Sequence, residues 1–328
     1  MKLEVKMRGK LGKSGGLCLV FIMLLSLIWA CTSSPAEAPA PPVAASPFPL
    51  EMTDQAGRIV SIEKIPEKII SLAPGNTEIL YALGLEDRLV GVTEYCNYPE
   101  AAKEKPKIGG FSTVDIERVV EIEPDLILAA NIHKGEVIPQ LERLGFTVLA
   151  LDPKTLDEVL EAINLIGRFT GKTEEAAQLT AEMENRIKAV TDKTATLSEA
   201  QRPRVFYILW HDPLMTVGRE TRIHELIIKA GGVNIARDLE GGYPTMSLEA
   251  VIMANPQVII AGSGHGSSQD LPFQFALTEP RLAEIAARQN ARVYEVDSDL
   301  TSRPGPRIVD GLEKLAQFIH PELFQESR

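Results

Sequence analysis

The sequence predicts an α/β protein of two similar lobes that are joined by a single long helix. Three observations lead to this prediction: a stretch that occurs twice, strands that alternate with helices, and one uninterrupted helical pattern between the two copies. The alternation indicates parallel sheets whose strands are connected by βαβ crossovers. A chain of 328 residues with 45% hydrophobic content is long enough to give each lobe its own core.

The repeated stretch runs from Phe111 to Ala129 and again from Tyr243 to Ala261, so each position recurs 132 residues later. In both copies an aromatic residue precedes a Glu by six positions, and a Pro follows that Glu by seven. Each copy is expected to form a short helix whose Val and Ile residues face inward. The helix ends before the proline, and a buried parallel strand follows.

The two lobes are expected over residues 50–172 and 199–328, with the linker helix over 173–198. Their strands are expected at 58–62, 68–74, 88–93, 125–128, 146–151, 202–209, 257–260 and 292–296. Helices are expected at 79–83, 156–169 and 308–319, and a proline-rich loop at 299–306. The turn at 75–78 either offers backbone N–H groups to a ligand or is a plain helix cap.

The N-terminus is expected to be a targeting segment. Five basic residues precede an apolar run that is too short to span a bilayer comfortably. The run ends Leu27-Ile28-Trp29-Ala30-Cys31, which resembles a bacterial lipobox and implies cleavage after residue 30 and a lipid on Cys31. An ordinary signal peptide or an uncleaved anchor is the alternative, and each of them exports the chain. Residues 31–49, rich in Ser, Ala and Pro, are typical of a flexible tether.

Charge and motif content narrow the function. The formal net charge is −11, and the basic residues of the leader make the remainder more acidic still, which argues against nucleic acid or an anionic membrane surface as main partner. The sequence has no Walker-A, Gly-x-Ser-x-Gly or His-Glu-x-x-His motif. Of its three cysteines only Cys96 would remain free in the mature chain. His211 and His265 follow strands, where open α/β sheets bind ligands.

Aromatic residues are scarce but gather on the loops at strand ends, which favours a stacking surface for a large flat or hydrophobic ligand. The alternative is that some of them cover their own cores. These aromatic residues are Tyr95, Tyr98, Phe111, Trp210 and Tyr243. Asp299 and Arg303 either present fixed polar groups to the ligand or form a surface ion pair of roughly 0–1 kcal/mol.

Glu117 and Glu249 occupy the same position of the two repeat copies. One exposed Glu on each lobe suits a pseudo-symmetric partner that carries Arg or Lys. The alternative is that both are solvated helix residues.

The sequence resembles the solute-binding proteins of ABC importers for cobalamin and ferric siderophores. The segments that carry this resemblance are Ser71-Leu-Ala-Pro-Gly-Asn-Thr-Glu78-Ile-Leu-Tyr-Ala-Leu-Gly84, Val90-Gly-Val-Thr-Glu-Tyr95-Cys-Asn-Tyr98-Pro99, Ile116 to Ala129, and Ala230-Gly-Gly-Val-Asn234. The resemblance covers the chain after the tether. It implies two Rossmann-like lobes joined by one helix, with ligand bound between them and little hinge motion.

The cobalamin branch is the most similar, and the resemblance implies roles for individual residues. Tyr95 matches an aromatic that faces the corrinoid, while Phe111 and Tyr243 stand where that branch often has Trp. Asp299 and Arg303 match a polar pair in the last loop. The resemblance further implies that Glu117 and Glu249 dock onto arginines of a dimeric permease, and that Ala130 leaves one wall more open than a bulky aromatic would.

The sequence is therefore expected to encode a monomeric, extracytoplasmic lipoprotein without cofactor or catalytic activity. It would capture a corrinoid, above all cobalamin, and deliver it to an ABC permease dimer with its ATPase subunits. A ferric siderophore or haem is the alternative ligand. Arg303, the one cation expected in the cleft, favours the corrinoid over anionic chelates. A metal or haem carrier that uses His211 and His265 is a further alternative. A nitrogenase-like subunit would need Cys ligands that the chain lacks.

Overall fold

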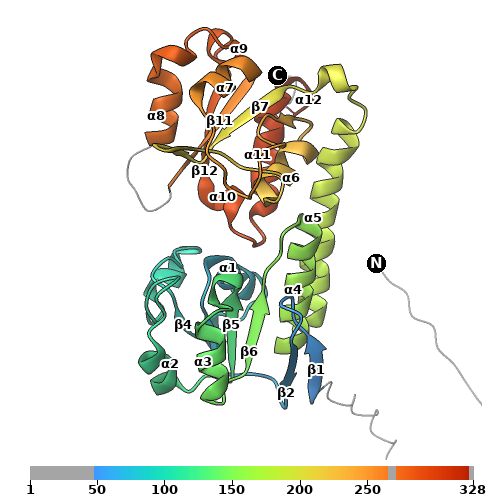
Figure 1. Ribbon diagram of the computed structural model, residues 1–328. Helices are drawn as coiled ribbons and strands as arrows, with labels where there is room; N and C mark the ends of the chain where they lie inside the picture. Colours follow the sequence, from blue (N-terminus) through green and yellow to red (C-terminus); the bar gives the residue numbers. More distant parts are fainter. Residues whose placement is uncertain (1–47, 265–270, 325–328) are drawn as a thin grey trace, which may run out of the picture. The chain divides into compact units, whose positions relative to one another are not determined.

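A computed structural model of the chain describes residues 48–264 and 271–324, which belong to one compact unit, Ser46–Arg328 (Figure 1). The expected signal segment, the lipidated Cys31, the tether up to residue 47 and His265 lie outside the described residues. Among the described helices, none combines the length and the hydropathy that a membrane crossing requires.

The N-terminal lobe is built on a parallel sheet in the order β4-β3-β5-β6. These strands are β3 (Ile69–Ser71), β4 (Leu89–Val92), β5 (Leu126–Ala130) and β6 (Val148–Leu151). Alternate residues of the strands enter two separate cores. One core packs against α1 (Pro74–Ala82) and α4 (Leu156–Thr170), and the other against α2 (Ile116–Ile122) and α3 (Val137–Arg143). Helices on both faces explain why these strands are apolar apart from Ser71. An antiparallel pair, β1 (Leu50–Thr53) and β2 (Ile59–Ile62), precedes the sheet.

The C-terminal lobe repeats this plan with the parallel order β10-β7-β11-β12. These strands are β7 (Arg204–Ile208), β10 (Val233–Asn234), β11 (Val258–Ser263) and β12 (Val293–Asp297). One face packs on α6 (Arg222–Lys229) and α11 (Ile308–Ile319). The other packs on α7 (Leu248–Ala254), α8 (Leu271–Thr278) and α9 (Ala286–Gln289). In chain order both sheets run second, first, third, fourth, as a duplicated lobe predicts. A short hairpin, β8 (Trp210–His211) with β9 (Leu214–Met215), and α12 (Pro321–Phe324) complete the lobe.

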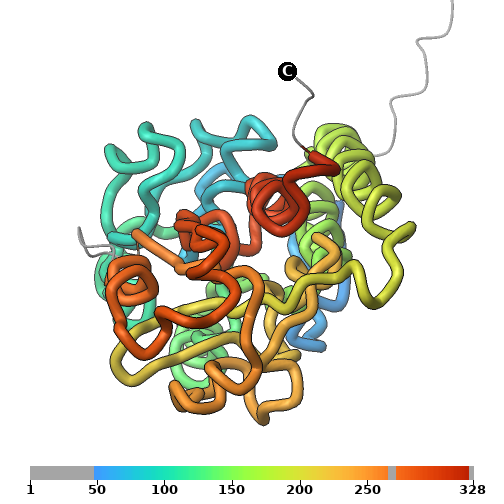
Figure 2. The backbone as a smooth tube through the Cα atoms, turned by 90° about the horizontal axis from the view of Figure 1, so that it is seen from above, coloured from blue at the N-terminus to red at the C-terminus, as the bar shows by residue number. Residues whose placement is uncertain are grey.

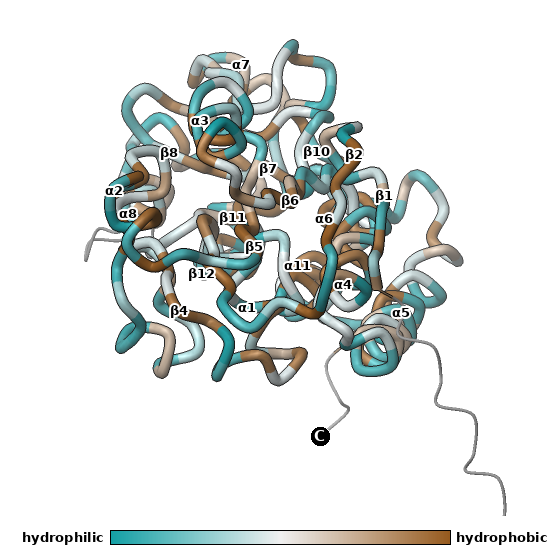
Figure 3. The backbone as a smooth tube through the Cα atoms, turned by 90° about the horizontal axis from the view of Figure 1, so that it is seen from below, coloured by the Kyte–Doolittle hydropathy of each residue, from teal (hydrophilic) through white to brown (hydrophobic). Residues whose placement is uncertain are grey.

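The helix α5 (Thr173–Thr194) joins the lobes. It packs on α4 of the N-terminal lobe and on α11 of the C-terminal lobe, and α11 lies beside α5 in Figure 2. A side chain at Gly167 of α4 would meet Ala176 of α5, so the glycine allows the two helices to approach closely. Arg186 of α5 forms ion pairs with Asp310 and Glu313 of α11. The outward face of α5 is hydrophilic, in contrast to strands such as β5 (Figure 3). The structure confirms the predicted α/β fold of two lobes joined by one helix.

The repeat forms matching elements in the two lobes. The helices α2 and α7 both end at a left-handed residue, Glu123 (φ 51°) and Asn255 (φ 43°), one position before the proline. The expectation that every Val and Ile of these helices faces inward is wrong. Val120 is 42% exposed and Ile252 is 39% exposed, because a helix of seven residues turns only one face to its sheet.

Two segments differ from their expected structure. The residues 75–78 lie inside α1, which begins at Pro74 because proline is tolerated in the first turn. Part of the expected loop 299–306 is helical, since α10 spans Ser298–Ser302. The carboxylate of Asp297 accepts a hydrogen bond from the Asp299 backbone N–H at 2.9 Å and caps this short helix.

Candidate ligand-binding site

A cavity of about 1130 Å³ lies between the lobes and is lined by residues of both. Its walls come from segments that follow the carboxyl ends of parallel strands, where open α/β sheets bind ligands. In the N-terminal lobe these segments are 73–76, 94–97, 111–112, 130–132 and 151–154. In the C-terminal lobe they are 220–223, 242–243, 264 and 299–304.

The cavity brings together five of the seven loop residues that the sequence suggested for ligand binding. These are Tyr95, Phe111, Tyr243, Asp299 and Arg303. Tyr98 is not among the lining residues, and neither is Trp210. Its indole Nε1 donates to the Asp212 carbonyl at 2.9 Å, and its ring lies against His211 at a centroid distance of 5.0 Å. Trp210 belongs to the β8–β9 hairpin and lies outside the cavity wall.

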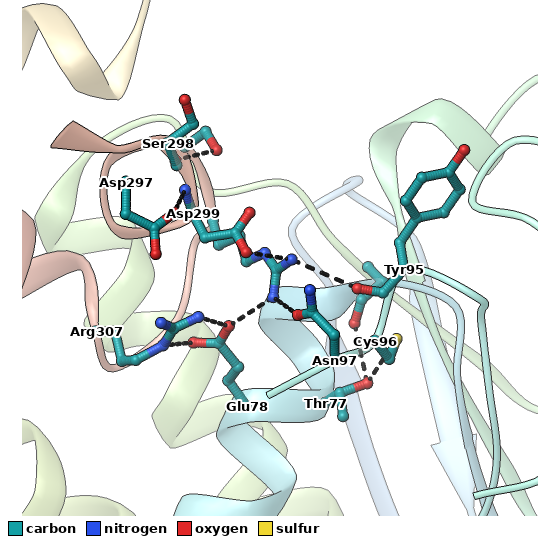
Figure 4. Close-up of polar contacts among 12 residues, drawn as sticks. Thr77, Glu78, Tyr95, Cys96, Asn97, Asp297, Ser298, Asp299 and Arg307 are labelled. Atoms are coloured by element: carbon teal, nitrogen blue, oxygen red, sulfur yellow. Dashed lines mark hydrogen bonds and ion pairs between the residues drawn. The ribbon is translucent and has the colours of Figure 1, made fainter. Parts of the chain in front are cut away.

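Tyr95 is 57% exposed in the loop that follows β4. The next residue, Cys96, is buried, and its sulfur accepts a hydrogen bond from Thr77 Oγ1 at 3.1 Å. Cys96 therefore fixes the loop from inside while the Tyr95 ring points away from the neighbouring polar contacts (Figure 4). This arrangement gives the buried thiol a structural role.

Phe111 is positioned by His133, a buried residue that the sequence did not single out. His133 Nδ1 accepts a hydrogen bond from the Ala130 backbone N–H at 2.9 Å, so Nε2 carries the proton and donates to the Phe111 carbonyl at 2.7 Å. The two rings also meet edge to face, with centroids 5.6 Å apart. Burial lowers the pKa of His133, although its two backbone hydrogen bonds oppose that shift. The neutral imidazole is the form that this geometry requires.

Tyr243 is 52% exposed at the wall contributed by the C-terminal lobe. Its loop is held by backbone hydrogen bonds on both sides, from Gly218 N–H to the Gly242 carbonyl at 2.7 Å and from Thr216 N–H to the Pro244 carbonyl at 2.9 Å. A Cβ at Gly218 would lie 2.1 Å from the Gly241 carbonyl oxygen, so only glycine permits this approach. The loop thus presents Tyr243 from a rigid base.

Charged side chains of both lobes meet beside the cavity in what we call the interlobe clasp: Glu78, Arg303 and Arg307. The Glu78 carboxylate of α1 accepts hydrogen bonds from Arg307 Nε at 3.0 Å, Arg307 Nη2 at 2.6 Å and Arg303 Nη1 at 3.1 Å (Figure 4). The Arg307 guanidinium also lies 3.7 Å from the ring centroid of Tyr98. Burial opposes the charged form of Arg307, but its bonds to Glu78 raise its pKa.

Asp299 and Arg303, four residues apart, form an ion pair at 2.6 Å. Arg303 also donates to Asn97 Oδ1 at 2.8 Å, in the N-terminal lobe. Burial raises the pKa of Asp299, and Arg303 offsets part of that rise. The pair is therefore continuous with the clasp and with the cavity wall, and its role extends beyond a surface ion pair.

The start of α1 touches the opposite lobe directly. A Cβ at Gly75 would lie 2.8 Å from the Pro304 carbonyl oxygen. Gly75 and Asn76 both line the cavity, so the first turn of α1 faces the space between the lobes.

The cavity holds more cationic side chains than the sequence suggested. Arg303 was the one cation expected there, but Arg222 and Lys154 line the cavity as well. Arg222 is the first residue of α6, after the helix cap Thr221, and Lys154 follows β6. Lys154 follows a strand end, which was the available signal for it, but neither residue lies in a segment that carries the family resemblance.

Glu117 and Glu249 are exposed near the starts of α2 and α7. The nearby Arg118 pairs with Asp115, and Arg281 pairs with Glu279 at 2.7 Å. Glu249 also borders a second, smaller recess of about 470 Å³, which includes His211 and Arg281. Neither Glu forms an ion pair with another residue in the described ranges, so both carboxylates are available to a partner.

Metal coordination has no candidate within residues 48–264 and 271–324. No group of three or more His, Cys, Asp or Glu side chains in these ranges is placed to hold a metal ion. His211 lies in the smaller recess instead of the main cavity, and His265 lies outside the described residues.

Comparisons with known proteins agree with this architecture. A model of the family described as periplasmic binding protein matches residues 69–300. The chain is 36% identical to the ABC transporter substrate-binding lipoprotein YvrC of Bacillus subtilis, over 85% of this chain and 88% of that protein. It is 32% identical to the crystal structure of the periplasmic vitamin B12 binding protein BtuF of Vibrio cholerae, which superposes with a TM-score of 0.66 over 80% of this chain and 99% of that one.

A haem-binding protein is a similar structural relative. The periplasmic heme-binding protein RhuT of Roseiflexus sp. RS-1 is 27% identical, with a TM-score of 0.69 over 78% of this chain and 98% of that one. Proteins of this family bind their substrates and do not transform them. By its family match, its relatives and its two-lobed architecture, the chain belongs to the periplasmic binding protein family and is a substrate-binding protein of an ABC importer.

Proposed function

We propose that the protein captures a corrinoid, above all cobalamin, outside the cytoplasmic membrane and delivers it to an ABC permease. The observation that carries this proposal is the cavity of about 1130 Å³ with Tyr95, Phe111 and Tyr243 in its walls. Pockets for drug-sized ligands occupy roughly 300–1,000 Å³, so this volume suits a ligand as large as a tetrapyrrole.

The aromatic walls match the chemistry of such a ligand. Tyr95 and Phe111 come from one lobe and Tyr243 from the other, so a broad macrocycle between the lobes would contact aromatic faces on both sides. The amides and hydroxyls of a corrinoid would find hydrogen-bonding partners in Asn76, Asn97 and the Asp299–Arg303 pair. The similarity to the vitamin B12 binding protein of Vibrio cholerae supports the same ligand class.

Delivery in this proposal uses Glu117 and Glu249, one on each lobe. Both carboxylates are exposed, and they stand at matching positions of the repeat. A permease dimer offers the same surface twice, and cationic side chains at both places would bind one Glu each. The protein would act as a monomer, held at the membrane by a lipid on Cys31.

Calorimetric titration of residues 46–328 with cyanocobalamin, haemin and a ferric siderophore tests the ligand. The proposal predicts tight binding of cyanocobalamin at a ratio of one to one. Binding of haemin or the siderophore together with no binding of cyanocobalamin would reject the corrinoid and leave the family assignment intact.

A further inference from the structure

Among the described residues, the cationic side chain of Arg222 has no counterion of its own in the cavity wall. Its two Nη atoms donate to main-chain carbonyls of Pro153 and, at 2.8 Å, of Ser302. Its Nε is buried and has no hydrogen-bond partner among the described residues. Carbonyl oxygens satisfy hydrogen bonds but do not neutralise a charge. Arg222 therefore keeps a positive charge in a largely desolvated place, and burial lowers its pKa.

The carboxylates around Arg222 are bound to other groups. Asp152 pairs with Lys154 at 2.7 Å and with Lys134 at 3.5 Å. Glu225 pairs with Lys229 at 3.5 Å and accepts a hydrogen bond from the Leu156 backbone N–H at 2.7 Å. Within the described ranges, no carboxylate oxygen lies within 4.0 Å of the Arg222 guanidinium.

The other arginine of the cavity differs in this respect. Arg303 is paired with Glu78 and Asp299 inside the protein, so the protein itself neutralises its charge. Arg222 lines the same cavity, and no carboxylate of the described part of the chain pairs with it. An anion delivered by the ligand would supply the counterion, and an Arg–oxyanion contact in a desolvated site is a strong, charge-assisted interaction.

We propose that Arg222 forms a subsite for an oxyanion of the ligand, a phosphodiester or a carboxylate, within the cavity that faces both lobes. This inference rests on the proposed function, because it assigns one group of the ligand captured there. A phosphodiester would come from the nucleotide loop of cobalamin, and a carboxylate from the propionates of haem. In either case the anion pairs with Arg222 while the macrocycle contacts the aromatic walls.

The test compares ligands with and without the oxyanion. The affinity of the protein for cyanocobalamin is compared with its affinity for cobinamide, which lacks the phosphodiester. The affinity for haemin is compared with that for its dimethyl ester, which lacks free carboxylates. We expect the bound ligand that carries the oxyanion to bind at least about tenfold more tightly than its counterpart. Arg222→Met should remove that difference, because it lowers the affinity only for the ligand that carries the oxyanion.

Arg292→Met is the matched control. Within the described ranges Arg292 also donates only to main-chain carbonyls, those of Phe318 and Ile319, and it does not line the cavity. It should leave both affinities unchanged. If Arg222→Met does not fold, Arg222→Gln, which removes the charge but keeps hydrogen-bond donors, is measured with the same ligand pairs.

The outcomes separate the inference from the function. Equal affinity of cyanocobalamin and cobinamide, or an equal effect of Arg222→Met on both, overturns the oxyanion subsite and leaves the corrinoid function standing. A preference of haemin over its ester, without corrinoid binding, supports the subsite and rejects the corrinoid. No binding of any of the four ligands overturns both.

Discussion

Arg307 of the C-terminal lobe donates hydrogen bonds from two guanidinium nitrogens to the carboxylate of Glu78 in the N-terminal lobe, at 2.6 and 3.0 Å. The Glu78 side chain is only 2% exposed, and Arg303 adds a third contact at 3.1 Å. A buried carboxylate shared by two arginines is a strong link as long as every member is present. Removing Glu78 leaves Arg307 desolvated and without its counterion, while Arg303 keeps its ion pair with Asp299.

Glu78→Gln should therefore lower the free energy of unfolding by about 3 kcal/mol, because the partly buried Arg307 loses its counterion and Arg303 keeps only Asp299. Urea unfolding of residues 46–328 measures this change. Glu313→Gln is the matched control, since Glu313 also pairs with an arginine but is 36% exposed. Its cost should stay below about 1 kcal/mol. Equal costs for the two variants would contradict an essential clasp.

Reversing both proposed docking charges, with Glu117→Arg and Glu249→Arg together, should abolish ligand delivery and leave ligand affinity nearly intact. The physical reason is that both carboxylates are exposed and neither lines the cavity. Uptake in cells and calorimetric titration measure the two properties separately. Glu182→Arg with Glu184→Arg, on the exposed side of α5, makes the same change in charge and should preserve uptake. A loss of affinity as large as the loss of uptake would reject the docking role.

Truncation of the aromatic side chains in the cavity walls should weaken ligand binding. Tyr95→Ala and Tyr243→Ala are each expected to raise Kd about tenfold, through lost stacking and lost apolar contact. Both side chains are more than half exposed, so the protein's stability should change little. Trp210→Ala is the control, because Trp210 does not line the cavity. A larger effect at Trp210 than at the two tyrosines would place the ligand elsewhere.

Stability should decline as the pH falls below about 6.5, partly through His133. Burial holds the folded-state pKa of His133 below its usual 6.5, so the folded protein favours the neutral ring. The contribution is complete above pH 6.5 and is lost as the pH falls toward the folded-state pKa. His224, whose pKa burial also lowers, should act in the same direction.

Thermal unfolding between pH 5 and 8 checks this expectation. His133→Gln should flatten the decline, and His224→Gln should remove a separate part of it. The His133 variant should also weaken ligand binding at pH 8, because Phe111 loses its anchor. An unchanged pH profile in His133→Gln would show that the imidazole carries no such linkage.

The architecture was predictable because it rests on patterns that recur within the chain. The duplicated stretch predicted two lobes with equivalent helices and strands, and the unbroken pattern after residue 172 predicted α5. Branched apolar runs can be recognised as buried strands wherever they occur. Such local patterns can be recognised from the sequence alone, without the three-dimensional structure.

Contacts between distant parts of the chain were not predictable in this way. Glu78 and Arg307 are 229 residues apart, and the sequence around one of them does not indicate contact with the other. The charge of Arg222 became notable only when its partners proved to be carbonyls. Trp210 looked equivalent to the other loop aromatics in sequence, but in the β8–β9 hairpin it lies outside the cavity wall. Each of these features depends on which loops face one another across the cavity.

The clasp also bears on the kinetics of ligand release. Glu78, Arg303 and Arg307 join the lobes through atoms of the protein itself, so the ligand's departure alone does not undo this link. Wide separation of the lobes requires these ion pairs between Glu78 and the two arginines to break. A partner that bound both lobes at once could pull them apart and so break the clasp. The residence time of the ligand would then depend on the binding of that partner as much as on the affinity of the cavity.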